Sequence, residues 1–96
     1  MKVYISIPKN ESVEESSARA HRIAQAIYDN GDQPVTPIEL CPFSDYEYNE
    51  SVGIDIGALI GCDAIYIDDG WEESKACLLE KAAADIYGLK YYFLIV

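Results

Sequence analysis

The sequence predicts an α/β protein: a single-domain, three-layer α/β/α sandwich built on a four-stranded parallel sheet. Short, almost wholly apolar segments alternate along the chain with longer segments whose apolar residues recur at helical spacing. Strands that are apolar on both faces are typical of a parallel sheet, because crossover helices cover both sides of it. The chain, residues 1–96, is long enough to form one core without disulfide or metal support. We therefore expect one domain.

The amino-terminal half predicts a strand, a helix and a second strand. Residues 2–7 (KVYISI) are rich in β-branched side chains, which favour a buried strand. In the segment 10–31, Ser12 and Glu15 have the spacing of a capping box, apolar residues then recur at helical spacing, and an Asn-Gly pair marks the end. Residues 33–37 (QPVTP) indicate a brief strand whose length is limited by its prolines.

The carboxyl-terminal half predicts two helices and two strands. Residues 38–50 have no clear period and suggest a surface loop that runs into a helix at 51–61, which its glycines weaken. A strand is expected at 63–67, a helix at 73–87 and a last buried strand at 90–96. With right-handed crossovers, a crevice then opens at the carboxyl ends of the first and third strands.

Charge and composition exclude several classes of function. Seventeen acidic residues against seven scattered basic ones give a net charge of −10, which disfavours binding to nucleic acid or to an anionic membrane. No apolar run approaches the length of a membrane helix, and the apolar run near the amino terminus is too short for a signal peptide. We therefore expect a cytoplasmic protein that binds a small molecule.

Cofactor and metal sites are not indicated. The three cysteines lack Cys-x-x-Cys or Cys/His spacing, so neither a disulfide framework nor a zinc site is expected. No Gly-rich phosphate loop follows the first strand, which argues against dinucleotide binding of the usual kind and against hydrolysis of nucleoside triphosphates. We expect no cofactor and no metal.

Polar residues stand where the predicted crevice lies. The residues of interest at the ends of the first and third strands are Ser6, Pro8, Asp68, Asp69 and Gly70. Acidic side chains do not lie unpaired in an apolar core, so the two aspartates face either the crevice or solvent. An Asp-Asp-Gly run is equally compatible with a polar turn that ends a strand.

Glu80 is the residue that the helical pattern does not explain. Its neighbours three and four positions away are small: Ala76, Cys77, Ala83 and Ala84. We expect the core side of this helix to consist of larger residues: Leu78, Leu79 and Ile86. Either a ligand, a backbone or a second copy of the chain approaches Glu80 closely, or Glu80 borders solvent and pairs with Lys81 or Lys90.

Three stretches taken together resemble a known family: "MKVYISIP", "VTP" and "IDIGALIGCDAIYIDDGWEESKACLLEKAAADIYGLK". They are similar to short members of the nucleoside 2-deoxyribosyltransferase-like superfamily, in particular to a small bacterial and phage family of uncharacterised function. The resemblance covers nearly the entire chain in order, and its most specific part runs from Cys62 to Glu80. It implies a flavodoxin-like or Rossmann-like form of the predicted sandwich.

The resemblance also implies a reaction and the residues that carry it. Enzymes of the superfamily cleave the N-glycosidic bond of a 2′-deoxynucleoside, with a glutamate early in the helix after the third strand as nucleophile. That position falls on Glu80, and the acidic position at the end of the third strand falls on Asp69. The tyrosine of the first strand falls on Tyr4, and the helix aspartate before Cys-Asp falls on Asp55. Ser74 stands where the transferases have an aspartate, as it does in the short family.

The implied chemistry requires two carboxyl groups. Displacement at an anomeric carbon passes through an oxocarbenium-like state, so one carboxylate attacks while an acid protonates the leaving base, and we assign these roles to Glu80 and Asp69. Ile7 and Ala76 replace glycines of the family, and both changes narrow the site. If Ser74 caps the helix, Glu80 lies about 9 Å further along its axis, so only a helix that starts near Ala76 brings it to the crevice.

The other candidates are substrate-binding residues: Tyr4, Ser6, Pro8, Asp55, Gly70, Trp71 and Ser74. Trp71 either stacks on a nucleobase or folds back over the following helix. Our first hypothesis is therefore an N-glycosidase or deoxyribosyltransferase that acts on a nucleoside or nucleotide.

Two alternatives come from other classes of protein. The first is a non-catalytic module that binds a nucleotide-like ligand. The second is an interaction protein whose small-residue helix face packs against another copy of the chain, through Ala76, Ala83, Ala84 and Tyr87. Because the superfamily commonly completes its sites with residues from a neighbouring subunit, the resemblance implies a homodimer or a larger homo-oligomer.

Overall fold

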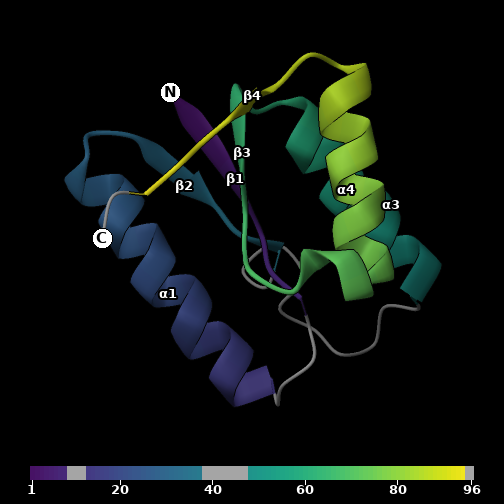
Figure 1. The fold of residues 1–96 in the computed structure, drawn as a ribbon, viewed down its shortest axis with the longest axis horizontal. Helices are drawn as coiled ribbons and strands as arrows, with labels where there is room; N and C mark the ends of the chain where they lie inside the picture. The colour runs from purple at the N-terminus through teal and green to yellow at the C-terminus, as the bar shows by residue number, and fades with distance from the viewer. Residues whose placement is uncertain (9–12, 38–47, 95–96) are drawn as a thin grey trace.

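The architecture is a three-layer α/β/α sandwich, as the sequence predicts (Figure 1). The structure is a computed structural model and describes residues 1–8, 13–37 and 48–94. Four parallel strands form the sheet in the order β2-β1-β3-β4. Their bounds are Lys2–Ser6 for β1, Gln33–Val35 for β2, Ala64–Ile67 for β3 and Lys90–Tyr91 for β4.

Helices cover both faces of the sheet. Their bounds are Val13–Asp29 for α1, Tyr48–Ile60 for α3, Trp71–Glu73 for the short 3-10 helix η1 and Lys75–Ile86 for α4. Figure 1 shows α1 alone on one face and α3 and α4 packed together on the other. No described helix is long and apolar enough to cross a membrane. Most of the predicted loop, residues 38–47, lies outside the described residues.

Two elements differ in length from the sequence prediction. The helix expected at 73–87 is divided, because η1 comes first and the side-chain oxygen of Ser74 then caps α4 by accepting a hydrogen bond from the backbone N–H of Cys77 at 3.3 Å. The last strand is shorter than expected. After β4, Tyr92 and Leu94 pack against the core beneath α1.

The register of the strands brings the carboxyl ends of β1 and β3 to one edge of the sheet. Tyr4 pairs with Ile65, and Ser6 pairs with Ile67. The residues that follow these strands therefore emerge at the same edge, where open parallel sheets commonly hold their ligands.

Side chains of β1 alternate between two separate cores. Val3 and Ile5 pack with α1, and so does Ile7, which follows the strand. Tyr4 packs on the opposite face with residues of α3 and α4, and Ser6 shares this face because alternate residues of a strand point the same way. Ile7 thus fills the core under α1, and the expectation that its side chain narrows the site beside Glu80 is wrong.

The buried face of α4 is its face of small residues. The buried residues are Cys77, Glu80, Ala83 and Ala84. The core side that the sequence predicted is instead exposed: Leu78 (45%), Leu79 (46%) and Ile86 (78%). The reason is steric, because Tyr4, Leu59 and Ile65 already fill much of the space beside the sheet, and the small side chains of Ala83 and Ala84 fit against them.

Candidate functional site

Glu80 lies under α4 and points at β1. Its side chain is only 5% exposed, and the phenol of Tyr4 donates a hydrogen bond to Oε2 at 2.5 Å. The hydroxyl of Ser6 donates to Oε1 at 2.7 Å. Each carboxylate oxygen therefore accepts a hydrogen bond from a different residue of one strand, which fixes the plane of the carboxyl group.

This geometry answers two sequence-based expectations about Glu80. The interpretation that it borders solvent and pairs with Lys81 or Lys90 is wrong, since Glu80 is buried and Lys81 pairs with Asp85 at 3.1 Å. The requirement for a helix start near Ala76 is also wrong. Although α4 begins at Lys75, Glu80 reaches Tyr4 and Ser6 sideways across the helix–sheet interface instead of along the helix axis.

Tyr4 is held in its protonated form. Burial raises the pKa of its hydroxyl strongly, and the negative charge of Glu80 and the hydrogen bond to it raise this pKa further. Asp55 and Cys62 act in the same direction, with smaller effects on the pKa of Tyr4. The phenol is therefore a permanent hydrogen-bond donor to Glu80 at any physiological pH.

Asp55 brings a second carboxyl group to the site. It is 6% exposed on α3 and lines a small cavity together with Glu80. We call this cavity the α3–α4 hollow; its lining residues are Asp55, Ile56, Ala76, Leu79 and Glu80. Its volume is about 10 Å³, close to that of one water-sized sphere, and Ala76 and Leu79 narrow it on the side of α4.

Cys77 lies on the buried face of α4 together with Glu80. Its side chain is completely buried, which raises the pKa of the thiol, whereas hydrogen bonds with the side chains of Ser6 and Ser74 lower this pKa. Sequence analysis gave Cys77 no role. The available signal was its position three residues before Glu80, which places both side chains on one face of the helix.

Asp68 faces the other side of the sheet. Its carboxylate is buried and forms a two-point ion pair with Arg19 of α1, with Nε to Oδ2 at 2.5 Å and Nη2 to Oδ1 at 2.9 Å. The hydroxyl of Tyr66 lies 3.5 Å from Oδ1. Asp68 therefore ties α1 to the end of β3, a role that sequence analysis missed because no helical pattern distinguishes Arg19 from a solvated arginine.

The remaining predicted residues lie outside the hollow. Asp69 is exposed, and Gly70 has φ of +86°, so this part of the Asp-Asp-Gly run forms a turn. Pro8 is buried and packs close to Gly70. Trp71 is half-buried, with Nζ of Lys81 5.6 Å from its ring centroid, so its ring folds back toward α4.

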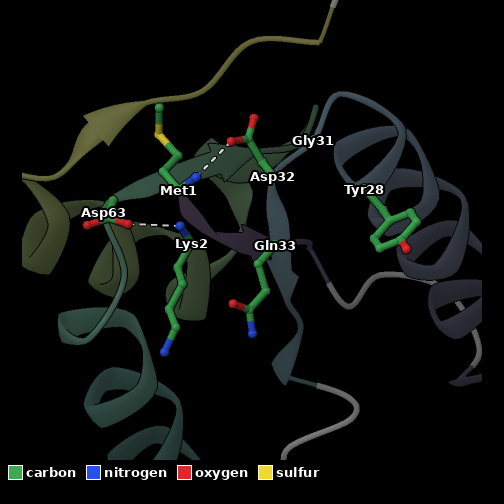
Figure 2. A pocket seen from close by; sticks show the side chains of 7 residues that line it. All are labelled: Met1, Lys2, Tyr28, Gly31, Asp32, Gln33 and Asp63. Atoms are coloured by element: carbon green, nitrogen blue, oxygen red, sulfur yellow. Dashed lines mark hydrogen bonds and ion pairs between the residues drawn. The ribbon is translucent and has the colours of Figure 1, made fainter.

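A larger cavity lies at the opposite edge of the sheet (Figure 2). It has a volume of about 470 Å³ and is lined by residues at the amino ends of β1 and β2, among others. Both of its acids are engaged: Asp32 accepts from the amino group of Met1 at 2.8 Å, and Asp63 accepts from the backbone N–H of Lys2 at 2.8 Å. Its size exceeds that of the α3–α4 hollow, but paired carboxyl groups at the predicted edge favour the hollow as the candidate site.

The chemistry of the site is that of carboxyl and hydroxyl groups. Within residues 1–8, 13–37 and 48–94, no cluster of histidine, cysteine, aspartate and glutamate side chains could hold a metal ion. The structure brings together Glu80, Tyr4, Ser6 and Asp55, and Ser74 caps the helix that carries Glu80. Two carboxyl groups in one site can take different roles: the carboxylate held by two donors can act as a nucleophile, and the other carboxyl group can act as an acid.

Comparison with solved structures identifies the fold. The chain aligns with a 2-deoxyribosyltransferase from the psychrotolerant bacterium Bacillus psychrosaccharolyticus with a TM-score of 0.71 and 17% identity. The alignment covers 95% of this chain and 69% of that one. At this identity the likeness concerns the fold, and it confirms the predicted resemblance to deoxyribosyltransferase-like proteins.

Comparison by sequence gives two further results. No curated protein matches the chain. A family model matches residues 1–93, which is nearly the whole chain. The chain therefore belongs to the family described as a domain of unknown function, DUF4406.

Proposed function

We propose that the protein acts at the N-glycosidic bond of a nucleoside or nucleotide, with Glu80 as the nucleophile. The observation that carries this proposal is the placement of the Glu80 carboxylate, buried between the hydroxyls of Tyr4 and Ser6 on the wall of the α3–α4 hollow. The fold likeness to a 2-deoxyribosyltransferase supports the class of substrate.

The reaction is a double displacement. An oxygen of Glu80 attacks C1′ of the sugar, the bond from C1′ to the base nitrogen breaks, and the electron pair leaves with the base, which takes up a proton from an acid. Water or a second base then attacks C1′ and releases Glu80 as a carboxylate. Transfer and hydrolysis differ only in this acceptor.

We assign the acid role to Asp55 in preference to Asp69. Asp55 lines the same hollow as Glu80, whereas Asp69 is exposed at the end of β3. A general acid has to lie within hydrogen-bond reach of the leaving group, so a carboxyl group in the hollow suits this role better than one in solvent. Asp69, with Trp71 nearby in the chain, is then a candidate for contact with the outer part of a substrate.

The small volume of the hollow is an observation that favours the alternative of an interaction protein. Ligand sites usually measure about 300–1,000 Å³, far more than the hollow provides, so Leu79 or α3 has to move before a nucleoside can enter. The small-residue stripe is not the contact surface, because Ala83 and Ala84 are buried within a single chain. We propose that a homodimer forms through the exposed side of α3 and α4. This surface contains Ile54, Ile60, Leu78, Leu79 and Ile86.

The test is direct. We would incubate the wild-type protein, Glu80→Gln and the exposed control Glu73→Gln with 2′-deoxynucleosides and their 5′-monophosphates, following free base by chromatography and the protein by intact mass. We expect base release and a deoxyribosyl adduct in the wild type and in Glu73→Gln, and neither in Glu80→Gln. If the wild type shows neither, the interaction protein or the non-catalytic binding module becomes the better-supported hypothesis.

We place the reaction in the cytoplasm, since the described cysteines, Cys62 and Cys77, are free thiols.

A further inference from the structure

We propose that Leu79 is the gate of the α3–α4 hollow: its side chain closes the passage from solvent to the Glu80 carboxyl group, and its movement admits a ligand. The inference deepens the proposed function and rests on it for the identity of the ligand, a nucleoside or nucleotide. Its physical content, control of access to Glu80, is a property of the substrate-free protein and is tested there.

Exposure to solvent changes sharply across the hollow. Its two acids lie deep, since Asp55 is 6% exposed and Glu80 is 5% exposed. Leu79 lines the same hollow but is 46% exposed, which makes it the most exposed of the five lining residues. One side of Leu79 therefore borders the hollow while another side is in solvent. Leu79 thus stands at the boundary between the two carboxyl groups and the outside of the protein.

The geometry of α4 places the side chain of Leu79 over the hollow. Ala76 and Leu79 are three positions apart, so they lie on the same side of the helix. A long side chain in a helix leans toward the turn that precedes it, and for Leu79 this is the turn of Ala76. Because Ala76 has only a methyl group, space remains beside it, and the leucine side chain covers this space from outside.

Movement of Leu79 requires less rearrangement than movement of α3. Leu79 is already half in solvent, and exposed side chains change rotamer within nanoseconds while the backbone stays in place. Displacement of α3 would instead pull Leu59 out of the core, where it is completely buried in one cluster with Tyr4 and Ile65. Exposing such an apolar side chain to water opposes that movement. The gate therefore opens by rotation of one side chain, not by separation of the two helices.

The experiment measures how fast the carboxyl group of Glu80 reacts with a water-soluble carbodiimide and glycinamide in substrate-free protein. Trypsin then releases residues 76–81 as one peptide, in which Glu80 is the one carboxyl side chain, so the mass of this peptide reports the labelling. Glu73 is the internal reference, because it is exposed on η1 and reacts in every variant.

Truncation of the gate should expose Glu80. We expect Leu79→Ala to speed the labelling of Glu80 by about tenfold, because the rate follows the population of the open form. The double variant Ala76→Leu/Leu79→Ala places a leucine on the same side of α4 one turn earlier, and it should restore the protection of Glu80. A Leu79→Ala variant in which Glu80 is as protected as in the wild type would overturn the proposal.

Leu78→Ala is the matched control. Leu78 is 45% exposed, nearly the same as Leu79, but it is not among the residues that line the hollow. Both leucines belong to the surface proposed for the homodimer, so a change in self-association affects the two variants alike. Labelling of Glu80 that is as fast in Leu78→Ala as in Leu79→Ala would also overturn the proposal.

A further variant tests the competing movement, that of α3. Gly57 lies on α3 with open space where a side chain would stand, so Gly57→Ala stabilises the helix without a clash. If α3 were the moving wall, Gly57→Ala would slow the labelling of Glu80 and Leu79→Ala would have little effect. We expect the reverse, with unchanged labelling in Gly57→Ala.

The result separates this proposal from the proposed function. If Leu79→Ala speeds the labelling of Glu80 and no base is released from any nucleoside tested, the gate stands and the glycosidic reaction does not. If base is released while labelling is the same in Leu79→Ala and the wild type, the reaction stands and the gate is refuted. When both hold, Leu79→Ala should change KM more than kcat, because the gate governs entry of the substrate and not the chemical step.

Discussion

Tyr4 and Glu80 are separated by 76 positions in the sequence, yet the phenol of Tyr4 donates to Oε2 of Glu80 at 2.5 Å in the interior of the domain. This contact joins the central strand β1 to α4 across the face that α4 shares with α3. Through it, a candidate nucleophile and the core of the fold depend on each other.

Tyr4→Phe should lower the free energy of unfolding and any glycosidic activity together. The change removes one donor and leaves Oε2 in a buried site, which costs about 2 kcal/mol for a hydrogen bond to a charged group. Urea denaturation measures the first effect and base release the second. Tyr28→Phe is the control, since Tyr28 is 68% exposed, and a loss of stability equal to that of Tyr4→Phe would contradict the prediction.

Asp55→Asn should slow base release more than Asp69→Asn does. If Asp55 protonates the leaving base, its loss lowers kcat by roughly 10²- to 10⁴-fold for ordinary purine nucleosides. A 7-methylated deoxyguanosine carries a cationic base that leaves without protonation, so Asp55→Asn should retain far more of its activity on this substrate. Equal losses on both substrates would show that Asp55 acts otherwise, and a larger loss in Asp69→Asn would restore Asp69 as the acid.

The contact between α4 and β4 should make stability depend on pH. A hydrogen bond from Tyr91 and the charge of Lys81 lower the pKa of Asp85 below 3.8, and hydrogen bonding to Asp85 is the main cause that raises the pKa of Lys81 above 10.5. The carboxylate contributes stability above about pH 4 that is lost as pH falls through its folded pKa; the ammonium contributes below about pH 10 until pH rises through its own.

The variant that checks this dependence is Asp85→Asn. Its deficit in stability relative to the wild type should be small, present at pH 7, and smaller at pH 2, because lowering the pH protonates the wild-type carboxyl group. Thermal unfolding at both values measures it. If the deficit in stability is the same at pH 2 as at pH 7, the shape of the Asp85 side chain, not its charge, is responsible.

Self-association should depend on the exposed side of α3 and α4. Ile86 is 78% exposed and Ile54 is 38% exposed, and Gly57 lies on α3 with open space where a side chain would stand. We expect light scattering at micromolar concentration to show a dimer or larger, and Ile86→Lys to reduce its mass toward that of one chain. Tyr28→Lys, on α1 across the sheet, should have no such effect. A wild-type protein that is monomeric at this concentration would contradict the proposed homodimer.

The order of strands and helices was predictable because each element carries its own local signal. The run at 2–7 and the helical spacing of apolar residues within 13–29 need no information from the rest of the chain, whereas the predicted capping residue Ser12 lies outside the described residues. The buried face of α4 was not predictable in this way. Leucine is more hydrophobic than alanine, so periodicity alone placed Leu78 and Leu79 inward, whereas the structure buries Ala83 and Ala84 against Tyr4, Leu59 and Ile65.

The site was predictable in part and for a different reason. The family resemblance selected Glu80, Tyr4 and Asp55 as candidates, and the fold brings these three together. The hydrogen bond from Ser6 to Glu80 and the pairing of Asp68 with Arg19 depend on how elements cross in space. Residue spacing within one element carries no information of that kind.

The alternation along β1 has a consequence for change by mutation. Its odd-numbered residues, Val3 and Ile5, contribute to the core under α1, and its even-numbered residues, Tyr4 and Ser6, hold Glu80. One strand thus supports the core with its odd-numbered residues and holds Glu80 with its even-numbered residues. Substitutions at the odd positions are therefore expected to change the stability of the core under α1 and to leave the contacts of the Glu80 carboxylate in place.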